Sequence, residues 1–388
     1  MVTVRATARG LFLSLFLLFS PLLEARGQES DFTFFRDDLD RESLRRAIRG
    51  SLEYLSRLPP ERLAGEAPAR FTVREVKDSL LSFIEILDLW DRPEVLSEEI
   101  RNRFYFYPAL EEEQKGDVLF TGYYQPVIEG SLAQSDEFRF PIYRKPADLI
   151  EAQLITLRPR YRADKIVGRM DEDRFAPYFS RHEIDTLERL RGKGYEIAWV
   201  KDPVELFFLH IQGSGLLKLE DGRLLHLNYH ASNGRPYRSI GRILIDRGKL
   251  AAEEVSMQRL RRYLLEHPGE MEGLFSENES YVFFRFVENG PLGSLEVPLT
   301  RGRSIATDAR FFPKGAIAFI MTYQPILDER SNLIGWQPIS RFVLNQDTGG
   351  AIRGRKRVDI YFGDDEEASQ KAGYMRSFGF LYFLKAKE

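Results

Sequence analysis

Two aspartates, Asp347 and Asp359, bracket the stretch D-T-G-G-A-I-R-G-R-K-R-V-D and are the first candidates for acid–base chemistry. In segment 358–362, which leaves this stretch, apolar residues alternate with polar ones, as in a strand with one buried face. A carboxylate on such a strand has a rigid support. Gly349 and Gly350 favour positive φ angles and close approach of the backbone to a ligand, so a tight turn is expected. We therefore predict a catalytic acid at Asp359.

The same residues also have a simpler interpretation. Asp347 can cap its own turn, and Asp359 can pair with one of the basic residues between them. These basic residues are Arg353, Arg355, Lys356 and Arg357. The triplet 347–349 also matches the aspartic-protease pattern, in which two aspartates share one proton. The chain has no second Asp-Thr/Ser-Gly triplet, so only an obligate dimer would support that reaction, and we do not favour it.

The composition describes an ordinary globular protein. Its 388 residues are 43% hydrophobic and 30% charged, and the length allows two domains or one large one. A net charge of −3 gives no reason to expect nucleic acid as a partner. His210, His226 and His230 lie close in the sequence but lack a metal-binding spacing, so we expect no metal and no other cofactor. We also expect a monomer.

The N-terminus predicts export. Arg5 and Arg9 precede an apolar run at 11–23, and Ala25 follows, so residues 1–25 match a signal peptide. The run is shorter than the about 20 residues of a comfortable membrane span, which makes an uncleaved anchor the less favoured alternative. The chain has no cysteine, hence no disulfide and no lipidated Cys. We expect an exported, periplasmic protein, whose association with the outer membrane would need an anchor other than a lipobox Cys.

Periodicity predicts helices first and strands afterwards. Helices are expected at 40–58, after a Thr72-x-x-Glu75 capping box, and at 93–104. Strands are expected at 118–124, 138–143, 195–200, 206–212, 215–219, 224–230 and from 281 nearly to the end, with helices at 180–191 and 252–266. The sequence therefore predicts a mainly β protein with helices at its N-terminus and in its middle.

Three other polar segments have no single interpretation. Residues 228–241 read N-Y-H-A-S-N-G-R-P-Y-R-S-I-G, which suits a polyhydroxyl ligand and equally suits a long loop. The Q-G-S-G turn at 212–215 lacks a P-loop lysine and the Rossmann spacing, so a phosphate site is not favoured. Asp308, in S-I-A-T-D, is by itself most simply a turn former.

Several long motifs occur together in one order. They are F-T-G-Y-Y-Q-P-V (120–127), F-P-I-Y-R-K-P (140–146), H-I-Q-G-S-G (210–215), N-G-R-P-Y-R-S-I-G (233–241), T-D-A-R-F-F-P-K-G (307–315) and D-T-G-G-A-I-R-G-x-x-x-V-D-I-Y-F-G (347–363). With these motifs, the chain from about residue 117 to its end resembles the membrane-bound lytic murein transglycosylase A family, which carries a C-terminal three-aspartate domain.

The resemblance implies a fold of two parts. A double-psi β-barrel with N-terminal helices would be formed by residues 32–126 and 275–388. A second β-rich, barrel-like domain at 127–274 would be inserted into it and bind substrate, with the glycan in the groove between the two. The change to new strands near 127 and their return at 281 fit this insertion.

The resemblance also implies a reaction. Family members cleave the β-1,4 bond between N-acetylmuramic acid and N-acetylglucosamine of peptidoglycan without water, leaving a 1,6-anhydro ring. The sugar's own C6 hydroxyl attacks C1, so one carboxyl group that first gives and then takes a proton is enough. By matching the family motif, Asp359 would be this acid/base and Asp347 would lie close to it.

We expect further residues to contact the sugars, and peptidoglycan glycan strands to be the main partner. The candidates are Thr121, Tyr123, Tyr124, Gln212, Asp308, Gly349, Gly350 and Tyr361. The backbone N–H groups of the two glycines would stabilise developing charge. Membership of a cell-wall synthesis or hydrolysis complex is a further expectation.

Two other functions stay open. An inverting glycoside hydrolase would use Asp359 as the acid and Asp347 or Asp308 as the base, on peptidoglycan or another β-1,4 glycan. A non-catalytic peptidoglycan-binding protein would use the aspartates only for structure. The chemistry of the products separates the first alternative from the lytic reaction, and the absence of turnover would favour the second.

Overall fold

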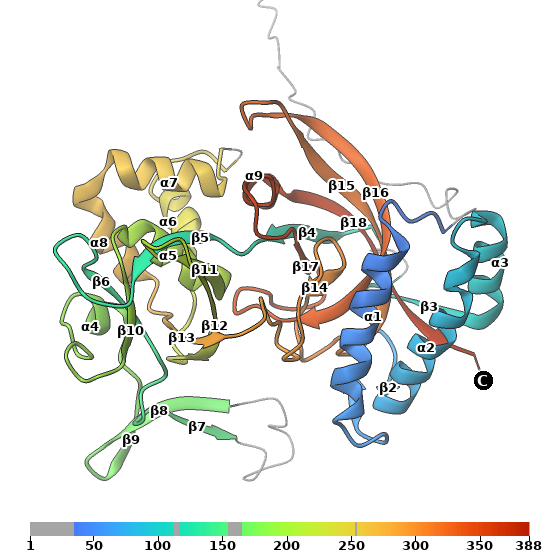
Figure 1. Ribbon diagram of the computed structural model, residues 1–388, viewed down its shortest axis with the longest axis horizontal. Helices are drawn as coiled ribbons and strands as arrows, with labels where there is room; N and C mark the ends of the chain where they lie inside the picture. The colour runs from blue at the N-terminus through green and yellow to red at the C-terminus, as the bar shows by residue number, and fades with distance from the viewer. Residues whose placement is uncertain (1–34, 112–115, 154–164, 253, 388) are drawn as a thin grey trace, which may run out of the picture.

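The computed structural model describes residues 35–111, 116–153, 165–252 and 254–387, so the predicted signal peptide at 1–25 lies outside the described residues. Figure 1 shows two lobes side by side. One contains the N-terminal helices and the C-terminal strands, and the other contains the middle of the chain.

A seven-stranded sheet forms the first lobe within the described residues. Its strands are β3 (Phe104–Pro108), β4 (Val118–Tyr123), β14 (Ser304–Ala306), β15 (Ile317–Leu327), β16 (Leu333–Asp347), β17 (Arg357–Tyr361) and β18 (Arg376–Ala386). The order is β15-β16-β14-β17-β4-β18-β3, and a further pairing of β15 with β18 closes six strands into a barrel. The β14–β16 and β17–β4 pairs are parallel. The barrel therefore combines chain segments from both sides of the second lobe, as predicted.

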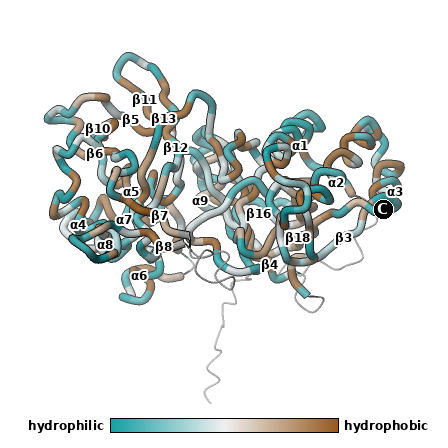
Figure 2. The backbone as a smooth tube through the Cα atoms, turned by 90° about the horizontal axis from the view of Figure 1, so that it is seen from below, coloured by the Kyte–Doolittle hydropathy of each residue, from teal (hydrophilic) through white to brown (hydrophobic). Residues whose placement is uncertain are grey.

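Three helices cover the outside of the barrel (Figure 1). They are α1 (Arg41–Ser56), α2 (Val73–Ile86), which continues into the 3₁₀ turn η2 (Leu87–Leu89), and α3 (Pro93–Arg103). Asp40 caps α1 by accepting a hydrogen bond from Ser43 N, and the predicted capping box of Thr72 and Glu75 begins α2. In Figure 2, α1 and α2 alternate hydrophilic and hydrophobic stretches, as expected of helices that bury one face.

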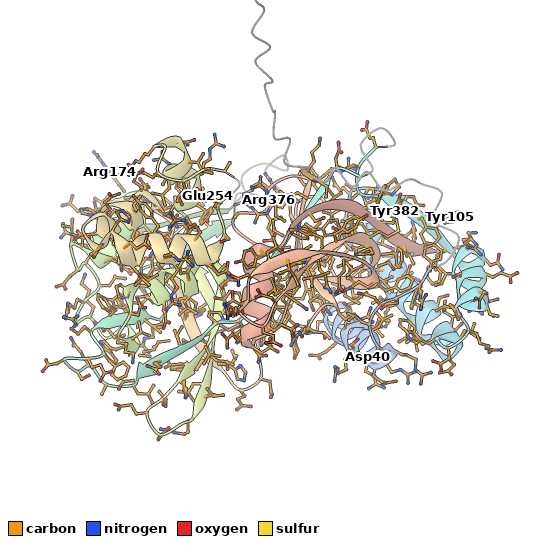
Figure 3. All side chains as sticks on the ribbon, turned by 90° about the horizontal axis from the view of Figure 1, so that it is seen from above. Asp40, Tyr105, Arg174, Glu254, Arg376 and Tyr382 are labelled. Carbon is orange, nitrogen blue, oxygen red and sulfur yellow. The ribbon has the colours of Figure 1, made fainter. Side chains whose placement is uncertain are left out.

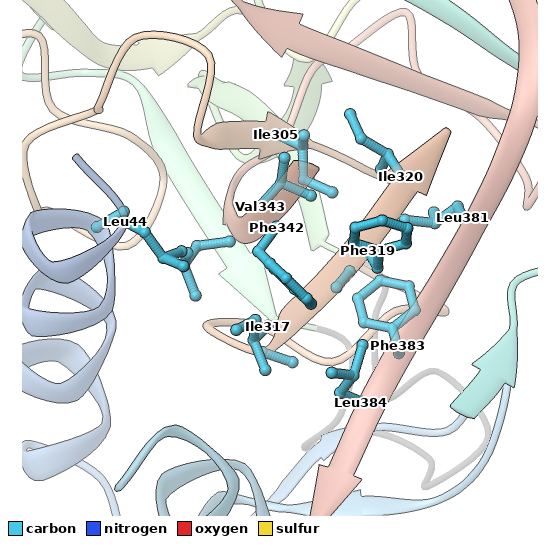
Figure 4. Packing of buried hydrophobic residues seen from close by; sticks show 14 of the residues in the cluster. Leu44, Ile305, Ile317, Phe319, Ile320, Phe342, Val343, Leu381, Phe383 and Leu384 are labelled. Atoms are coloured by element: carbon cyan, nitrogen blue, oxygen red, sulfur yellow. The ribbon is translucent and has the colours of Figure 1, made fainter. Parts of the chain in front are cut away.

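The core of the first lobe lies between these helices and the barrel. Figure 4 shows Leu44 of α1 facing the side chains of β15, β16 and β18, including Phe319, Phe342 and Phe383. Leu44, Phe342 and Phe383 are fully buried. Burying each such side chain contributes about 1.5–3 kcal/mol. The strands that end near the predicted site are thus held by a packed core.

The second lobe is built on a six-stranded sheet with the order β13-β12-β11-β5-β10-β6. Its strands are β5 (Val127–Ser131), β6 (Phe140–Tyr143), β10 (Glu196–Val200), β11 (Ser214–Lys218), β12 (Leu224–Ser232) and β13 (Val282–Val287). A smaller sheet of β7 (Ile150–Gln153), β8 (Lys165–Asp171) and β9 (Arg174–Pro177) extends from this lobe (Figure 1). β13 lies beyond residue 274, where the sequence analysis placed the return to the barrel, and pairs with β12.

Five helices accompany the described part of this lobe. They are α4 (Arg181–Asp185), α5 (Pro203–Gln212), α6 (Ile240–Asp246), α7 (Met257–Glu266) and α8 (Pro268–Glu277). α4 lies within the helix predicted at 180–191, and α7 lies within the helix predicted at 252–266. α6 and α8 were not predicted. Neither was α9 (Glu366–Tyr374) of the first lobe, which Asp365 caps by accepting from Ala368 N.

The strand predicted at 206–212 is wrong, because this segment forms most of α5. Asp202 caps the helix by accepting from the backbone N–H groups of Val204 and Glu205, and Pro203 occupies its first turn. Gly213 ends it in the left-handed conformation, with φ 78°. The apolar residues of α5 are buried on nearly all sides, so their sequence shows no helical period.

Within the described ranges, no helix is both long enough and apolar enough to span a bilayer.

Candidate active site

The two aspartates of the C-terminal motif lie on either side of a single residue, Ala306 of β14. Ala306 pairs with Asp347 of β16 on one side and with Asp359 of β17 on the other. Adjacent strands are about 4.8 Å apart, so the two Cα atoms are separated by roughly 10 Å. Asp359 pairs in turn with Thr121 of β4, and Thr121 pairs with Arg376 of β18. One row across the barrel therefore carries both carboxylates, and Figure 3 places Arg376 between the lobes.

Asp359 is held by one hydroxyl and one guanidinium. The hydroxyl of Thr121 donates to Oδ1, and Arg357 donates from Nε to Oδ1 at 3.0 Å and from Nη2 to Oδ2 at 3.2 Å. Arg357 lies two residues earlier on the same strand and so faces the same side. The Asp359 side chain keeps 14% of its surface exposed. It therefore has the predicted rigid support and also the ion pair of the simpler interpretation.

Asp347 is enclosed and accepts three hydrogen bonds. Its Oδ1 accepts from the backbone N–H groups of Thr348 at 2.8 Å and Ser294 at 2.9 Å, and its Oδ2 accepts from the hydroxyl of Tyr123 at 3.0 Å. Burial raises the pKa of Asp347 to about 6, although these donors and the charge of Lys314 act in the opposite direction. Asp347 thus caps its own turn and is also a carboxyl group that titrates near neutral pH.

Two tyrosines complete the surroundings of Asp347. Tyr123 of β4 pairs in register with Tyr361 of β17, and their ring centroids are 5.4 Å apart. Burial, followed by the negative charge of Asp347, raises the pKa of Tyr123 well above its usual value. Burial also raises the pKa of Tyr361. Both hydroxyls therefore stay protonated and available as hydrogen-bond donors.

Asp308 supports the loop between the other two aspartates. Its carboxylate binds the guanidinium of Arg310, with Nη2 at 2.6 Å, and accepts from Gly354 N at 2.8 Å. Burial acts to raise the pKa of Asp308, but these donors outweigh it and the pKa is lowered. The side chain is only 2% exposed. This geometry favours positioning of the loop over direct contact with a sugar.

The glycine turn differs in detail from its prediction. A turn is present, in which Ile352 N donates to Gly349 O at 3.0 Å. Neither Gly349 nor Gly350 has a positive φ, and the glycine of this loop that does is Gly354, at 80°. An added Cβ would lie 3.0 Å from Ile352 at Gly349 but would meet no atom within 4 Å at Gly350, so the turn favours a small residue at 349 and the left-handed conformation at 354.

Tyr124 and Gln212 meet at the crossing between the lobes, away from the aspartates. Oε1 of Gln212, at the end of α5, accepts from Tyr124 N at 3.1 Å, and its Nε2 lies 3.8 Å from Sδ of Met257. Tyr124 also lines a cavity of about 430 Å³ between α5, α7 and α9, which neither Asp347 nor Asp359 lines. Of the predicted contacts, Thr121, Tyr123 and Tyr361 are therefore the ones assembled around the two carboxylates.

Sequence reasoning did not assign a role in the site to several residues that the structure brings there. Arg357 was only one of four bases, although its two-residue spacing from Asp359 on a strand would have singled it out. Tyr237 belongs to the polar stretch 228–241. Burial raises its pKa, and the charges of both Arg357 and Asp359 act on it, so this loop of the second lobe faces the carboxylate. The position of Ser294 in the sequence gives no sign that its backbone N–H would donate to Asp347.

The described residues contain no cluster of three or more His, Cys, Asp or Glu side chains that could hold a metal ion.

Comparisons with known proteins agree with this arrangement. Residues 119–285 match the family model described as the MltA specific insert domain, and residues 303–385 match the 3D domain. The membrane-bound lytic murein transglycosylase A of Escherichia coli strain K12 is 33% identical over 273 residues, which are 70% of this chain and 66% of the relative. The chain thus spans about two thirds of the length of that curated relative.

Solved structures are similar over most of the chain. A membrane-bound lytic murein transglycosylase from Agrobacterium tumefaciens is 32% identical, with a TM-score of 0.73 over 89% of this chain and 93% of that one. The Escherichia coli MltA structure with bound chitohexaose is 27% identical, with a TM-score of 0.66 over 88% of this chain and 89% of that one. The predicted fold class, a barrel interrupted by an insertion, is confirmed by these structures and by the strand pairing. The chain therefore belongs to the membrane-bound lytic murein transglycosylase A family.

Proposed function

We propose that this protein is a peptidoglycan lytic transglycosylase. It cleaves the β-1,4 bond between N-acetylmuramic acid and N-acetylglucosamine without water and leaves a 1,6-anhydro end. The observation that carries the proposal is the row Asp347–Ala306–Asp359, in which two differently bonded carboxylates lie on either side of a single strand. The family membership and the chitohexaose bound by the Escherichia coli relative support a glycan strand as the ligand.

Asp359 acts as the single acid/base in this proposal. Its protonated carboxyl gives a proton to the glycosidic oxygen while the bond from C1 to that oxygen breaks. The resulting carboxylate then takes the proton of the C6 hydroxyl as O6 bonds to C1. The acid is thereby regenerated, and no water is consumed. Thr121 holds Oδ1 of Asp359 and so fixes which oxygen faces the sugar.

Arg357 has to release Asp359 before the first step. A protonated carboxyl cannot accept both Arg357 hydrogen bonds as the carboxylate does in the described state. We expect the incoming sugar to displace the guanidinium of Arg357, whose side chain is 34% exposed. Asp359 alone then faces the glycosidic oxygen.

Asp347 stabilises the positive charge that develops at C1. With a pKa of about 6, it is roughly nine-tenths ionised at pH 7. An anion fixed by two backbone amides and Tyr123 needs no reorganisation when the charge forms. In this proposal Tyr361 contacts the sugars from the barrel, and Tyr237 contacts them from the second lobe.

The proposal extends to the division of the chain and to its location. The glycan lies between the barrel and the second lobe, which the chain enters after β4 and leaves after β13. The protein is exported to the periplasm as a monomer and acts on glycan strands there, alone or in a cell-wall complex. The relatives are named membrane-bound lytic murein transglycosylases, which supports a position at the cell envelope.

Product analysis tests the reaction. The protein is incubated with purified peptidoglycan in ¹⁸O-labelled water, and the released muropeptides are analysed by mass spectrometry. We expect products one water lighter than reducing-end fragments, with no label incorporated. Labelled reducing ends would replace the lytic reaction by hydrolysis, and no release at all would favour a binding protein.

One observation favours the hydrolase as a second candidate. Asp347 titrates near neutral pH and lies two strands from Asp359, so the pair resembles the acid and base of an inverting enzyme, whose carboxyl groups stand about 6.5–9.5 Å apart. In that reaction Asp347 would activate a water and Asp359 would remain the acid. The labelled-water experiment decides between the two.

A further inference from the structure

A second cavity lies beside the active site, on the side of the barrel that α1 covers. It has a volume of about 370 Å³ and is enclosed by the C-terminal part of α1, the short strand β1 (Leu63–Gly65), and the turn at 309–314. Its polar lining consists of Tyr54, Arg62, Arg310 and Lys314. Among the described residues, no carboxylate side chain lines it.

Two of the three cations in this cavity lack a counter-ion. Among the described residues, neither Arg62 nor Lys314 forms an ion pair, whereas Arg310 is bound to Asp308. Lys314 is partly buried, and its pKa is lowered first by this burial and then by the charge of Arg62. Two like charges therefore act on each other, Lys314 from a partly buried position and Arg62 from an exposed one, and an anion between them would relieve their repulsion.

The backbone holds these cations together. Lys314 N donates to Ala64 O at 3.2 Å, and Val73 N donates to Arg62 O at 2.9 Å. At Gly65 an added Cβ would lie 2.5 Å from Pro313 N, so only glycine allows this close approach of β1 to the turn. The fold therefore holds the main chain of Arg62 next to that of Lys314, so both side chains start from neighbouring positions at the cavity.

We propose that this cavity is a binding site for an oxyanion, a carboxylate or a phosphate group, held by Arg62 and Lys314. Arginine and lysine bind such groups through charge-assisted hydrogen bonds, and the hydroxyl of Tyr54 adds a donor at the wall. If the proposed function holds, the source is a carboxylate of a peptide stem on the glycan strand. A free phosphate is the other source of the same chemistry.

Lys314 connects this site to the reaction. Its charge acts on Asp347, and Asp347 is the carboxylate that acts most on Lys314. An anion bound at Lys314 would offset the effect of the Lys314 charge on the pKa of Asp347. A strand that bears stems would therefore be positioned, and the active site tuned, by one contact that a naked glycan cannot make.

Phosphate binding tests the site without any turnover. The protein is titrated with sodium phosphate by calorimetry, at an ionic strength held constant with sodium chloride. We expect saturable binding, weakened about tenfold or more by Arg62→Gln and by Lys314→Gln. Arg330→Gln, which removes an exposed charge from the turn between β15 and β16, should bind as the wild type does. Absence of binding by the wild type, or equal binding by Arg62→Gln, overturns the proposal. Arg62 is exposed, so this variant remains informative even where Lys314→Gln fails to fold.

A second arm identifies the source of the anion. Rates are compared on glycan strands that carry peptide stems and on the same strands after an amidase has removed them. A several-fold loss of kcat/KM for Arg62→Gln on stem-bearing strands only assigns the site to the stem carboxylate. Lost phosphate binding with equal rates on both substrates assigns it to a free anion. A wild type that releases no anhydro product from either substrate contradicts the proposed function and leaves the phosphate result to decide on the site.

Discussion

The hydroxyl of Tyr123 donates a 3.0 Å hydrogen bond to Oδ2 of Asp347, which joins β4 to the end of β16 across the barrel. This bond stabilises the carboxylate and thereby lowers the pKa of Asp347, against the effect of burial. The titration of Asp347 is thus set by a residue that lies before the whole second lobe in the sequence.

Tyr123→Phe should therefore raise the pKa of Asp347 above about 6. A hydrogen bond to a charged group is worth about 1.5–3 kcal/mol, so we expect the pKa to rise by roughly one unit or more. The midpoint of the acidic limb in the profile of rate against pH should move up by the same amount. Tyr105→Phe is a matched control, because Tyr105 is 52% exposed and lies at the far end of the barrel lobe (Figure 3). A midpoint that is unchanged or falls would contradict the assignment.

Asp347 should also make folding stability depend on pH. Its folded pKa, about 6, lies above the ordinary aspartate value of 3.8, so the folded state binds more protons between these values. The contribution of Asp347 to the free energy of unfolding is therefore fully present below about pH 4 and is lost as the pH rises through 6. Relative to the wild type, Asp347→Asn should gain stability over this range and no more above it. Chemical denaturation at a series of pH values measures the difference, and a difference that shrinks as the pH rises would disprove the sign.

Asp359→Asn should abolish glycan cleavage and leave folding intact. Loss of a general acid costs about 10²–10⁴ in rate. The amide can still accept from Thr121 and Arg357, so the thermal transition should stay close to that of the wild type. Release of muropeptides and retention on insoluble peptidoglycan are measured on the same preparation. Substantial residual release would remove Asp359 from the acid/base role.

Asp308→Asn should act through the loop and not through the chemistry. The carboxylate of Asp308 joins Arg310 to Gly354, and an amide cannot accept all of these bonds. We expect a loss of about 1–3 kcal/mol in the free energy of unfolding and a lower rate. The pH optimum should not shift, because the lowered pKa of Asp308 keeps its carboxylate ionised at that pH. A displaced optimum with full stability would instead make Asp308 part of the catalytic apparatus.

Local signals in the sequence predicted the local structure well. The Thr72–Glu75 capping box and the alternation of 358–362 correspond to the start of α2 and to β17, because caps and strand faces depend on neighbouring residues. The strand predicted over most of α5 failed where burial on all sides removed the periodicity. For α5, the capping residues Asp202 and Gly213 indicate a helix more clearly than the hydrophobic pattern does.

Long-range register could not be predicted from local pattern. Thr121 and Asp359 are paired across 238 residues, and Ala306 lies between the two aspartates without any chemical signal of its own. The strand pattern pointed to Asp359 as a catalytic acid, and the resemblance to a family added its role as the single acid/base. The ion pair with Arg357 and the hydrogen bond from Ser294 to Asp347 depend on which strands become neighbours. Such contacts follow from the closed barrel and become visible only with it.

Arg357→Gln tests whether the guanidinium that holds Asp359 must be displaced. Arg357 donates to both oxygens of Asp359 in the described state, so the variant frees the carboxyl while Thr121 still orients it. If displacement by the sugar opposes binding, KM should fall several-fold. If Arg357 also aligns the carboxyl, kcat should fall about tenfold or less. Arg353→Gln, at an exposed position of the same loop, controls for the change in charge. Equal kinetic constants for Arg357→Gln and Arg353→Gln would show that the ion pair has no part in the reaction.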